Sequence, residues 1–496
     1  MLKGSSGIFL LALAGVYLLF GCGAVTNPTP TPTSNSFPVV VFSDVHFNPF
    51  YDPSLFQQLL ANDPSQWQSI FQNSTVKTVS AWGSDTNYPL LKLALSSIKQ
   101  NLGASPVVIY TGDLIGHSFP TDFYCLYMPP HALGCPAVVP TVDEVAAMQA
   151  FTDKTVAFVT AQVRASVGNI PVMFAVGNID SYTGYGPDST FLSNNAETFY
   201  TQFVNGAADQ QTFLNTFKSG GYYSAQPLGS KLTVIGLNTN PFALGVPGDN
   251  DSAVAAELSW LDSTLASAQA AGQEVWLLMH VPPGANTVTT AESIDGNGQI
   301  ASATMMMYQS YQTSLLQILA KYPGLITMTL GAHTHMDEYR ILSPSVVLDE
   351  VPAISPCFGE NPAFKIFTVT QNTFTPTDYK SLNYVLAAVP SPVPPLAKFT
   401  SYYTFSTTYS MSGPLGASLV QLYPELATNI SLTKSLPNAQ QTSYMGQYNS
   451  GNASWNANGQ PQPGYWNAIT NENWPVFACG IGKVAQLDFE DCVNSY

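Results

Sequence analysis

The chain has 496 residues and a formal net charge of −16 at pH 7, with only 9% charged residues. Soluble domains usually carry roughly 25% charged residues, so uncharged polar residues supply most of this surface. The 15 Lys and Arg residues are too few for the positive surface of a nucleic-acid scaffold. A hydrophobic content of 45% supports a large core and excludes an intrinsically disordered chain.

Residues 1–21 are predicted to be a signal peptide. The apolar run at 8–20 is shorter than the roughly 20 residues of a membrane-spanning helix and suits a signal-peptide core. It ends in Leu19-Phe20-Gly21-Cys22, which resembles a bacterial lipobox. We therefore expect a lipoprotein anchored through lipidated Cys22 to the periplasmic or cell-surface side of a bacterial membrane. The alternative is an ordinary cleaved signal peptide or an uncleaved anchor.

Residues 22–37 are rich in Pro, Thr and Ser and are predicted to form an extended tether. Five cysteines follow Cys22. In an oxidising compartment, Cys125 with Cys135 and Cys479 with Cys492 would each close a short loop as a disulfide. Cys357 is left over, and we expect it to be buried and free.

Short apolar runs, several of them rich in β-branched residues, are each followed by a polar cluster. They occupy residues 39–42, 107–110, 172–176, 275–279 and 326–330. Continuous apolar runs of this length are typical of buried strands. Helical patterns separate them: apolar spacing at 90–98, a capping box that opens a helix at 141 and runs to about 163, and a leucine face at 258–265. This alternation predicts βαβ units and an α/β fold.

The polar clusters lie at strand ends, where α/β sheets bind ligands. Four of the six histidines are there, together with two aspartates and one asparagine: Asp44, His46, Asp113, Asn178, His280, His333 and His335. Imidazole and carboxylate donors suit zinc, iron or manganese. A carboxylate can also bridge two ions about 3.5–4 Å apart. The sequence therefore predicts a binuclear centre of two divalent transition-metal ions, with zinc expected and iron or manganese as alternatives.

These clusters resemble the motifs of the calcineurin-like metallophosphoesterases, and more narrowly those of the acid-sphingomyelinase-like phosphodiesterases. The motifs are Asp44-x-His46, Gly112-Asp113, Gly177-Asn178, His280-Val281-Pro282-Pro283-Gly284 and Gly331-Ala332-His333-Thr334-His335. The resemblance implies two packed, mostly parallel β-sheets flanked by helices in a catalytic domain over residues 38–385. A small helical subdomain would follow over residues 386–496.

The resemblance also implies a role for each ligand. Asp44, His46 and His335 would hold the first metal, Asn178, His280 and His333 the second, and Asp113 would bridge the two. The expected activity is hydrolysis of phosphodiester bonds by a hydroxide between the metals. The substrate would be sphingomyelin-like, a nucleotide or another soluble diester.

Two further residues are candidates for roles beside the ligands. His117 is the candidate general acid for the leaving group, with a loop histidine that only hydrogen-bonds a ligand as the alternative. Asp180 either orients a ligand or simply opens the next loop.

Two departures from the family pattern bear on function. Ile179 occupies the position after the asparagine, where the family usually has a histidine that contacts the phosphate. A short tether precedes Val39, where the family's sphingomyelinases carry a saposin-like domain. The alternatives are therefore a non-catalytic metal-binding lipoprotein and a phosphomonoesterase or polyphosphatase that uses the same site. We expect a monomer.

Overall fold

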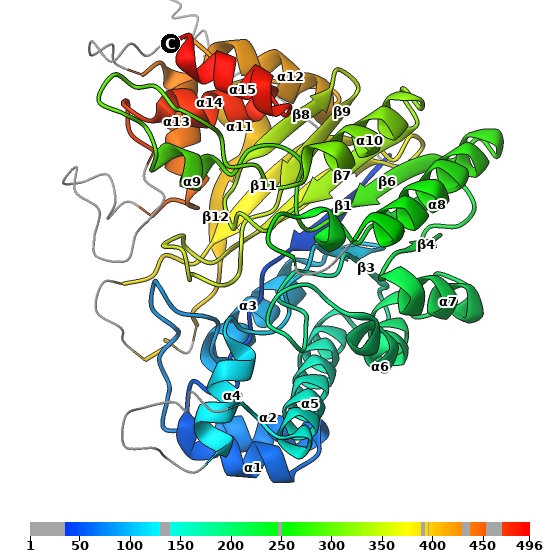
Figure 1. Cartoon of the computed structure of the whole chain (residues 1–496), viewed down its shortest axis with the longest axis vertical. Coiled ribbons are helices and arrows are strands. Elements are labelled where there is room, and N and C mark those ends of the chain that lie inside the picture. Colours follow the sequence, from blue (N-terminus) through cyan, green and yellow to red (C-terminus); the bar gives the residue numbers. More distant parts are fainter. Residues whose placement is uncertain are drawn as a thin grey trace, which may run out of the picture. The chain divides into compact units, whose positions relative to one another are not determined.

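The computed structural model describes residues 35–128, 139–246, 250–387, 392–394, 396–428, 437–452 and 469–496. Two six-stranded sheets form its centre, and helices flank them (Figure 1). One hydrophobic cluster contains side chains from both sheets, including Val41 of the first and Trp276 of the second. The predicted α/β class with two sheets is confirmed.

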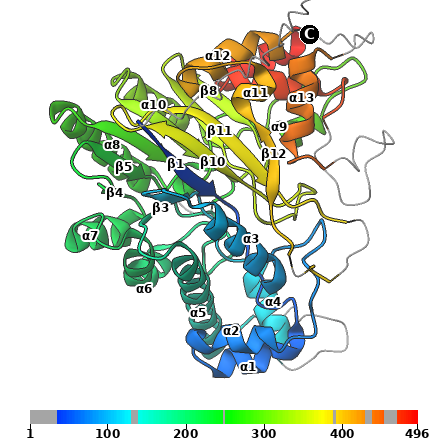
Figure 2. The same ribbon diagram turned by 180° about the vertical axis from the view of Figure 1, so that it is seen from behind.

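The first sheet has the strand order β12-β11-β10-β1-β2-β3. Its members are β1 (Ser36–Phe42), β2 (Val108–Tyr110), β3 (Val172–Phe174), β10 (Ala363–Thr370), β11 (Pro376–Asn383) and β12 (Thr400–Thr404). Only β1–β2 and β2–β3 are parallel pairs. Figure 2 shows β1, β10, β11 and β12 side by side.

The second sheet has the order β4-β5-β6-β7-β9-β8. Its members are β4 (Tyr223–Ala225), β5 (Leu232–Gly236), β6 (Glu274–Leu278), β7 (Ile326–Gly331), β8 (Tyr339–Ser343) and β9 (Val346–Glu350). The pairs β5–β6, β6–β7 and β7–β9 are parallel. The outer pairs β4–β5 and β8–β9 are antiparallel.

The sheets are thus mixed, which corrects the expectation of mostly parallel pairing. Parallel strands are confined to the centre of the second sheet and one side of the first. The chain between β8 and β9, and that between β10 and β11, is only a short turn. A short turn can join antiparallel neighbours but not parallel ones, which need a crossover. These hairpins add antiparallel strands to a parallel centre.

The helices that precede β7 are α1 (Phe56–Ala61), α2 (Pro64–Gln72), α3 (Tyr88–Asn101), α4 (Phe119–Tyr127), α5 (Val142–Val167), α6 (Ser189–Phe199), α7 (Gln210–Gly220), α8 (Asp251–Ala270), α9 (Thr287–Ala291) and α10 (Gln309–Ala320). Short turns of helix occupy Pro53–Leu55, Tyr200–Val204 and Asn240–Phe242. The predicted capping box is present: Thr141 caps α5 and Glu144 bonds back to it. The helix predicted at 90–98 is α3.

The side chains of β6 show that the second sheet is packed on both of its faces. Successive side chains of a strand point to opposite faces. Val275 and Leu277 join the cluster that contains Leu261 and Leu265 of α8, whereas Trp276 and Leu278 join the cluster shared with the first sheet. Because both faces of β6 are covered, all of its residues after Glu274 are apolar rather than alternating.

The C-terminal region contributes both a strand and helices. Strand β12 lies at the edge of the first sheet, where Thr400 pairs with Asn383 of β11. The helices are α11 (Phe405–Tyr409), α12 (Leu415–Leu426), α13 (Ala439–Tyr448), α14 (Trp474–Gly482) and α15 (Gln486–Asn494). Of the aromatic residues near β12, Tyr403, Phe405 and Tyr409 are buried. The sheet therefore continues past residue 385 into the predicted helical subdomain.

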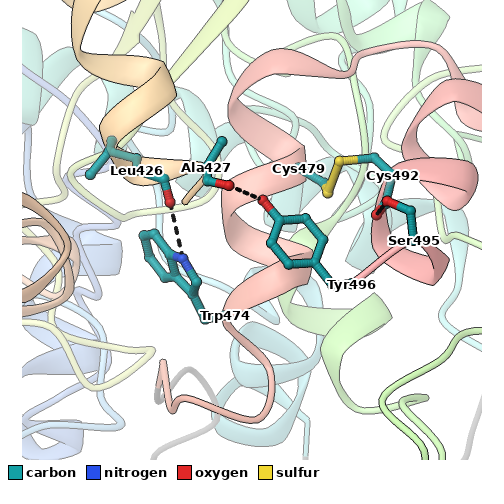
Figure 3. The surroundings of a disulfide bond; sticks show 7 residues. All are labelled: Leu426, Ala427, Trp474, Cys479, Cys492, Ser495 and Tyr496. Atoms are coloured by element: carbon teal, nitrogen blue, oxygen red, sulfur yellow. Dashed lines mark hydrogen bonds between the residues drawn. A yellow bond between two sulfur atoms is a disulfide. The ribbon is translucent and has the colours of Figure 1, made fainter. Parts of the chain in front are cut away.

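The predicted Cys479–Cys492 disulfide joins α14 to α15 (Figure 3). Cys125 is disulfide-bonded, and its predicted partner Cys135 lies outside the described residues. Cys357 is a free thiol, as expected, but is only partly buried.

The predicted signal peptide, lipobox and most of the tether fall in residues 1–34, outside the described residues. Among the residues that the structure describes, no helix has both the length and the apolar character needed to cross a membrane.

Candidate metal centre

The seven predicted ligands converge where strands of the two sheets end. Residues 44 and 46 follow β1, residue 113 follows β2, residue 178 follows β3, residue 280 follows β6, and residues 333 and 335 follow β7. All five strands belong to the parallel parts of the sheets. Parallel strands of one sheet place their carboxyl ends at one edge, and these edges of the two sheets meet here, so that His46 and His335, 289 positions apart, lie in contact.

One group surrounds His46. Its Nε2 lies 3.8 Å from Asp44 Oδ1, 3.4 Å from Asp113 Oδ2 and 3.0 Å from His335 Nε2. His335 Nε2 lies 3.5 Å from Asp44 Oδ1. Asp44, His46 and His335 are all buried. These are the residues that the resemblance assigns to the first metal, with the bridging aspartate beside them.

The second group surrounds His280. Its Nε2 lies 3.0 Å from Asp113 Oδ2 and 2.9 Å from Asn178 Oδ1. The ring of His333 meets that of His280 edge to face, with centroids 5.3 Å apart. Asp113 is the residue that both groups share, and this is the position that a bridging carboxylate requires.

The hydrogen bonds of three rings leave their Nε2 lone pairs facing the cluster. Nδ1 of His46 lies 3.2 Å from the carbonyl of Ile115. Nδ1 of His280 lies 2.8 Å from the carbonyl of Thr111. Nδ1 of His335 lies 3.0 Å from Oε1 of Glu360. An acceptor beside Nδ1 places the ring proton on Nδ1, so Nε2 keeps the lone pair that can bind a metal ion.

The arrangement of these buried donor atoms favours the binding of positive ions. Both carboxylate oxygens of Asp44 are buried without a hydrogen-bond partner among the described residues. Buried polar groups are normally paired, and lone pairs packed about 3 Å apart repel one another. Two cations among these donors would satisfy Asp44 and remove the repulsion, so the residues fit a binuclear metal centre.

Burial also keeps two of the rings neutral. Burial, with the charge of His280, lowers the pKa of His333 to about 3. Burial lowers the pKa of His335 to about 4 against the opposing effect of Asp44. Neutral imidazole is the form that binds metal. Burial lowers the pKa of His280, but the negative charge of Asp113 outweighs this effect and raises the pKa to about 9. A positive charge is therefore favoured between these two side chains.

The backbone of the ligands is strained. Asp44, His46, Asp113, His333 and His335 have φ between +42° and +76°. This left-handed region costs about 1–3 kcal/mol for a non-glycine residue and persists only where the surroundings enforce it. Such residues concentrate at functional sites, as they do here.

Two glycines of the motifs are required by close contacts. A Cβ at Gly177 would lie 2.0 Å from Asp113 Oδ1, and a Cβ at Gly112 would lie 2.6 Å from His280 Nδ1. Gly112 also has φ +111°, which L-residues rarely adopt. The glycine in each motif therefore makes room for the ligands of the neighbouring loop.

Asp180 joins the loops after β2 and β3. Its Oδ1 accepts the Leu114 amide at 2.7 Å, and its Oδ2 accepts the amides of Gly177 at 3.0 Å and Asp113 at 3.2 Å. Burial and the nearby Asp113 carboxylate raise the pKa of Asp180 to about 7. The geometry favours the orienting role over that of a residue that merely opens a loop.

Asp180→Ala is expected to lower metal affinity by about 10–100-fold, the usual effect of losing a partner that orients a ligand. The substitution leaves the Asp113 and Gly177 amides without their acceptor, so Asp113 loses its fixed position. Equilibrium metal titration measures the change. Asp188→Ala is the matched control, because Asp188 caps α6 through Thr190 and Phe191 and should affect stability alone. An affinity equal in the two variants would contradict the orienting role.

A cavity of about 780 Å³ opens over the metal ligands. It is lined by Gly83, Asp113, His117, Asn178, Ile179, Tyr185, Asn286, Thr287, Val288, Thr289, Glu292, Met306, His333, Thr334, His335, Cys357 and Phe358. Ile179 lies on the wall, and its amide donates to Asp113 Oδ1 at 2.7 Å. Its apolar side chain adds no proton donor. None of the lining residues is Lys or Arg.

His117 lies on the cavity wall beside the first group. Its Nδ1 is 2.8 Å from Asp85 Oδ1, and its amide donates to Asp85 Oδ2 at 2.6 Å. Its ring stacks on His46 with centroids 4.0 Å apart. Burial opposes a charge on the ring, but the hydrogen bond and charge of Asp85 outweigh it and raise the pKa of His117. A protonated His117 at the cavity is suited to donate a proton.

The sequence analysis did not identify three residues that support the site. Asp85 holds His117, and Glu360 holds His335. Arg340 bonds Glu350 and donates from Nη1 to the carbonyls of Pro283 at 3.2 Å and Ala285 at 2.8 Å. Glu350 Oε2 accepts from Thr334 Oγ1 at 2.9 Å, so Arg340 ties the loop after His280 to the loop of His333 and His335. None of Asp85, Glu360 and Arg340 lies in one of the sequence motifs that carry the predicted ligands.

The site is a buried cluster of candidate metal ligands at the strand ends, and comparison with known proteins shows what this chain is similar to. No protein-family model matches the chain. Sphingomyelin phosphodiesterase B of Dictyostelium discoideum is 26% identical over 373 residues, which cover 69% of this chain and 50% of that protein. The cyclic GMP-AMP phosphodiesterase SMPDL3A of Rattus norvegicus is 24% identical over 404 residues, 78% of this chain and 80% of that protein.

The chain is therefore homologous to the sphingomyelin phosphodiesterases and to the acid-sphingomyelinase-like SMPDL3A, which confirms the resemblance that its motifs indicate. The matched part spans only half the length of the Dictyostelium relative. Among solved structures, a dimetal phosphatase from Danio rerio aligns with a TM-score of 0.40 and 9% identity, over 74% of this chain and 98% of that one.

Proposed function

We propose that this protein is a binuclear metal-dependent phosphodiesterase. One observation carries the proposal: Asp113 lies between two groups of buried N and O donors, at 3.4 Å from His46 Nε2 and 3.0 Å from His280 Nε2. The names of the relatives, which are phosphodiesterases, support the reaction class. We further propose zinc as the metal, because imidazole donors predominate among the ligands.

When bound, the two ions would supply Lewis-acid activation of the phosphoryl group and of the attacking water. The chain's own side chains do the rest. The Nδ1 partners of His46, His280 and His335 keep those rings in place. Asp85 holds His117 at the cavity wall, from which His117 donates a proton to the leaving oxygen.

The cavity has the size of a site for a drug-sized ligand. One relative is named for sphingomyelin and another for cyclic GMP-AMP. For this chain we propose phosphodiester substrates as a class, sphingomyelin-like, nucleotide or otherwise soluble.

The test uses protein stripped of metal and reloaded with zinc, manganese or iron. Rates are measured on bis-p-nitrophenyl phosphate, p-nitrophenyl phosphate and polyphosphate. Metal-dependent hydrolysis that is fastest on the diester supports the proposal. Faster cleavage of the monoester or of polyphosphate would assign the alternative phosphatase activity.

A second candidate is a non-catalytic metal-binding protein. Ile179 favours it, since an apolar side chain on the cavity wall takes the place of the family's phosphate-contacting histidine. Two bound metal ions per chain with no hydrolysis of any of the three compounds would establish it.

We also propose that the protein is a monomer tethered through Cys22 outside the cytoplasm. The Cys479–Cys492 disulfide is typical of oxidising compartments, and the lipobox-like Leu19-Phe20-Gly21-Cys22 supports lipidation.

Cys22→Ser is expected to abolish lipid labelling and to leave the protein either soluble or unprocessed. Stable anchoring needs more than one acyl chain, so the loss of the modified cysteine removes the anchor entirely. Membrane fractionation and mass spectrometry of the N-terminus measure the result. Cys357→Ser is the control. A Cys22→Ser protein processed and fractionated like the wild type would exclude the lipobox.

A further inference from the structure

A second set of metal-binding side chains lies beside the seven ligands. Asp85, His117 and Cys357 each offer a donor atom, and these three atoms lie within 4.8 Å of one another. None of the three is needed by the binuclear centre. His117 and Cys357 line the cavity, so an ion in solution can reach them.

The trio is held in place by its surroundings. Both oxygens of Asp85 bond to His117, one to Nδ1 at 2.8 Å and one to the backbone amide at 2.6 Å. The ring of His117 is further fixed by stacking on His46 at 4.0 Å. Cys357 Sγ lies 3.5 Å from Nδ1 of His335. Donors fixed in this way lose little entropy when an ion binds.

The donor chemistry differs from that of the binuclear centre. The seven ligands there are N and O atoms, whereas Cys357 contributes a free thiol. A thiolate favours zinc and cadmium over manganese or magnesium. One sulfur, one nitrogen and one oxygen donor leave a fourth tetrahedral position open for water, and the cavity supplies the space for it.

We propose that Asp85, His117 and Cys357 form a third cation site, selective for thiophilic divalent ions, whose occupation inhibits the enzyme. As the ion binds, the thiol proton of Cys357 and the Nδ1 proton of His117 pass to solvent, and bonds from the ion to sulfur and nitrogen replace them. His117 is then a neutral imidazole bound to the ion, and its remaining Nε2–H is too weak an acid to protonate the leaving group. This consequence rests on the proposed function; the ion binding does not.

The third ion binds more weakly than the first two. Its ligands touch His46 and His335, so it lies close to the charge of the first metal, and like charges repel. Inhibition therefore develops only at zinc concentrations above those that fill the binuclear centre.

The experiment has a spectroscopic arm that is independent of activity. Protein loaded with two equivalents of Mn²⁺ is titrated with Cd²⁺, and thiolate-to-cadmium absorption in the ultraviolet is recorded. We expect one further equivalent to bind with this absorption, and we expect Cys357→Ser to abolish it. Asp85→Asn should weaken it, and Asp188→Ala, which removes only the cap of α6, should leave it unchanged.

The kinetic arm compares each protein with itself at stoichiometric and at excess zinc. Loss of general-acid catalysis costs about 10²–10⁴-fold, so excess zinc should slow alkyl diester hydrolysis by at least about tenfold in the wild type. In Cys357→Ser the ratio of the two rates should approach one. Cadmium absorption without any hydrolysis would support the third site while overturning the proposed function. Normal hydrolysis without Cys357-dependent absorption would overturn the third site alone.

Discussion

Asp113→Ala is expected to remove more than half of the bound metal and nearly all activity. Its Oδ2 atom lies 3.4 Å from His46 Nε2 and 3.0 Å from His280 Nε2, so both donor groups lose a member at once. Loss of an outer partner alone costs about 10–100-fold, and loss of a shared ligand should exceed about 100-fold. Elemental analysis gives metal per chain, and hydrolysis of bis-p-nitrophenyl phosphate gives the rate.

Asp143→Ala is the matched control, since Asp143 is an exposed carboxylate in the first turn of α5. Asp113→Asn separates charge from shape, because it retains the size of the side chain and one oxygen but loses the negative charge. We expect it to bind less metal than the wild type and more than the alanine variant. An Asp113→Ala protein that is metal-free and fully active would refute the binuclear centre.

The second large effect concerns protonation of the leaving group. Ile179 lies on the cavity wall and cannot donate a proton. General-acid catalysis is worth about 10²–10⁴-fold, and aryl diesters with good leaving groups need little of it. His117→Ala should therefore slow alkyl diesters by that factor and aryl diesters much less, with metal content unchanged. Parallel kinetics on the two substrate types measure the difference.

Ile179→His should do the reverse and raise the rate on alkyl diesters more than on aryl ones. The substitution leaves the contact with Asp113 in place, because the bond to Asp113 Oδ1 comes from the backbone amide of residue 179. Both substitutions act on one proton transfer, so their effects should not add. Equal effects on alkyl and aryl diesters would exclude both residues from protonating the leaving group.

The pH dependence provides a further test of the same step. Asp85 raises the pKa of His117, so the protonated form extends above the usual pKa of about 6.5. Alkyl diester hydrolysis should be retained up to the raised pKa and fall as the pH rises through it. In His117→Ala this limb of the profile should be missing.

The sequence by itself indicated the seven candidate ligands and their places along the chain. Each of Asp44, Asp113 and His280 directly follows, or nearly follows, an apolar strand, and a strand is recognised from a few neighbouring residues. The start of α5 could also be predicted from neighbouring residues, because a capping box needs only Thr141 and Glu144. Since parallel strands end at one edge, local patterns sufficed to predict that distant residues would meet.

Only the tertiary structure decided which residues support those ligands and how the sheets are completed. Asp85 meets His117, Glu360 meets His335, and Arg340 reaches the Pro283 and Ala285 carbonyls. These contacts join segments 25 to 57 residues apart. No sequence pattern links the two segments, so neither residue can be predicted from the other. Strand β12 follows the same rule, because the partner of a strand is set by side chains packed from elsewhere in the chain and not by its own propensity.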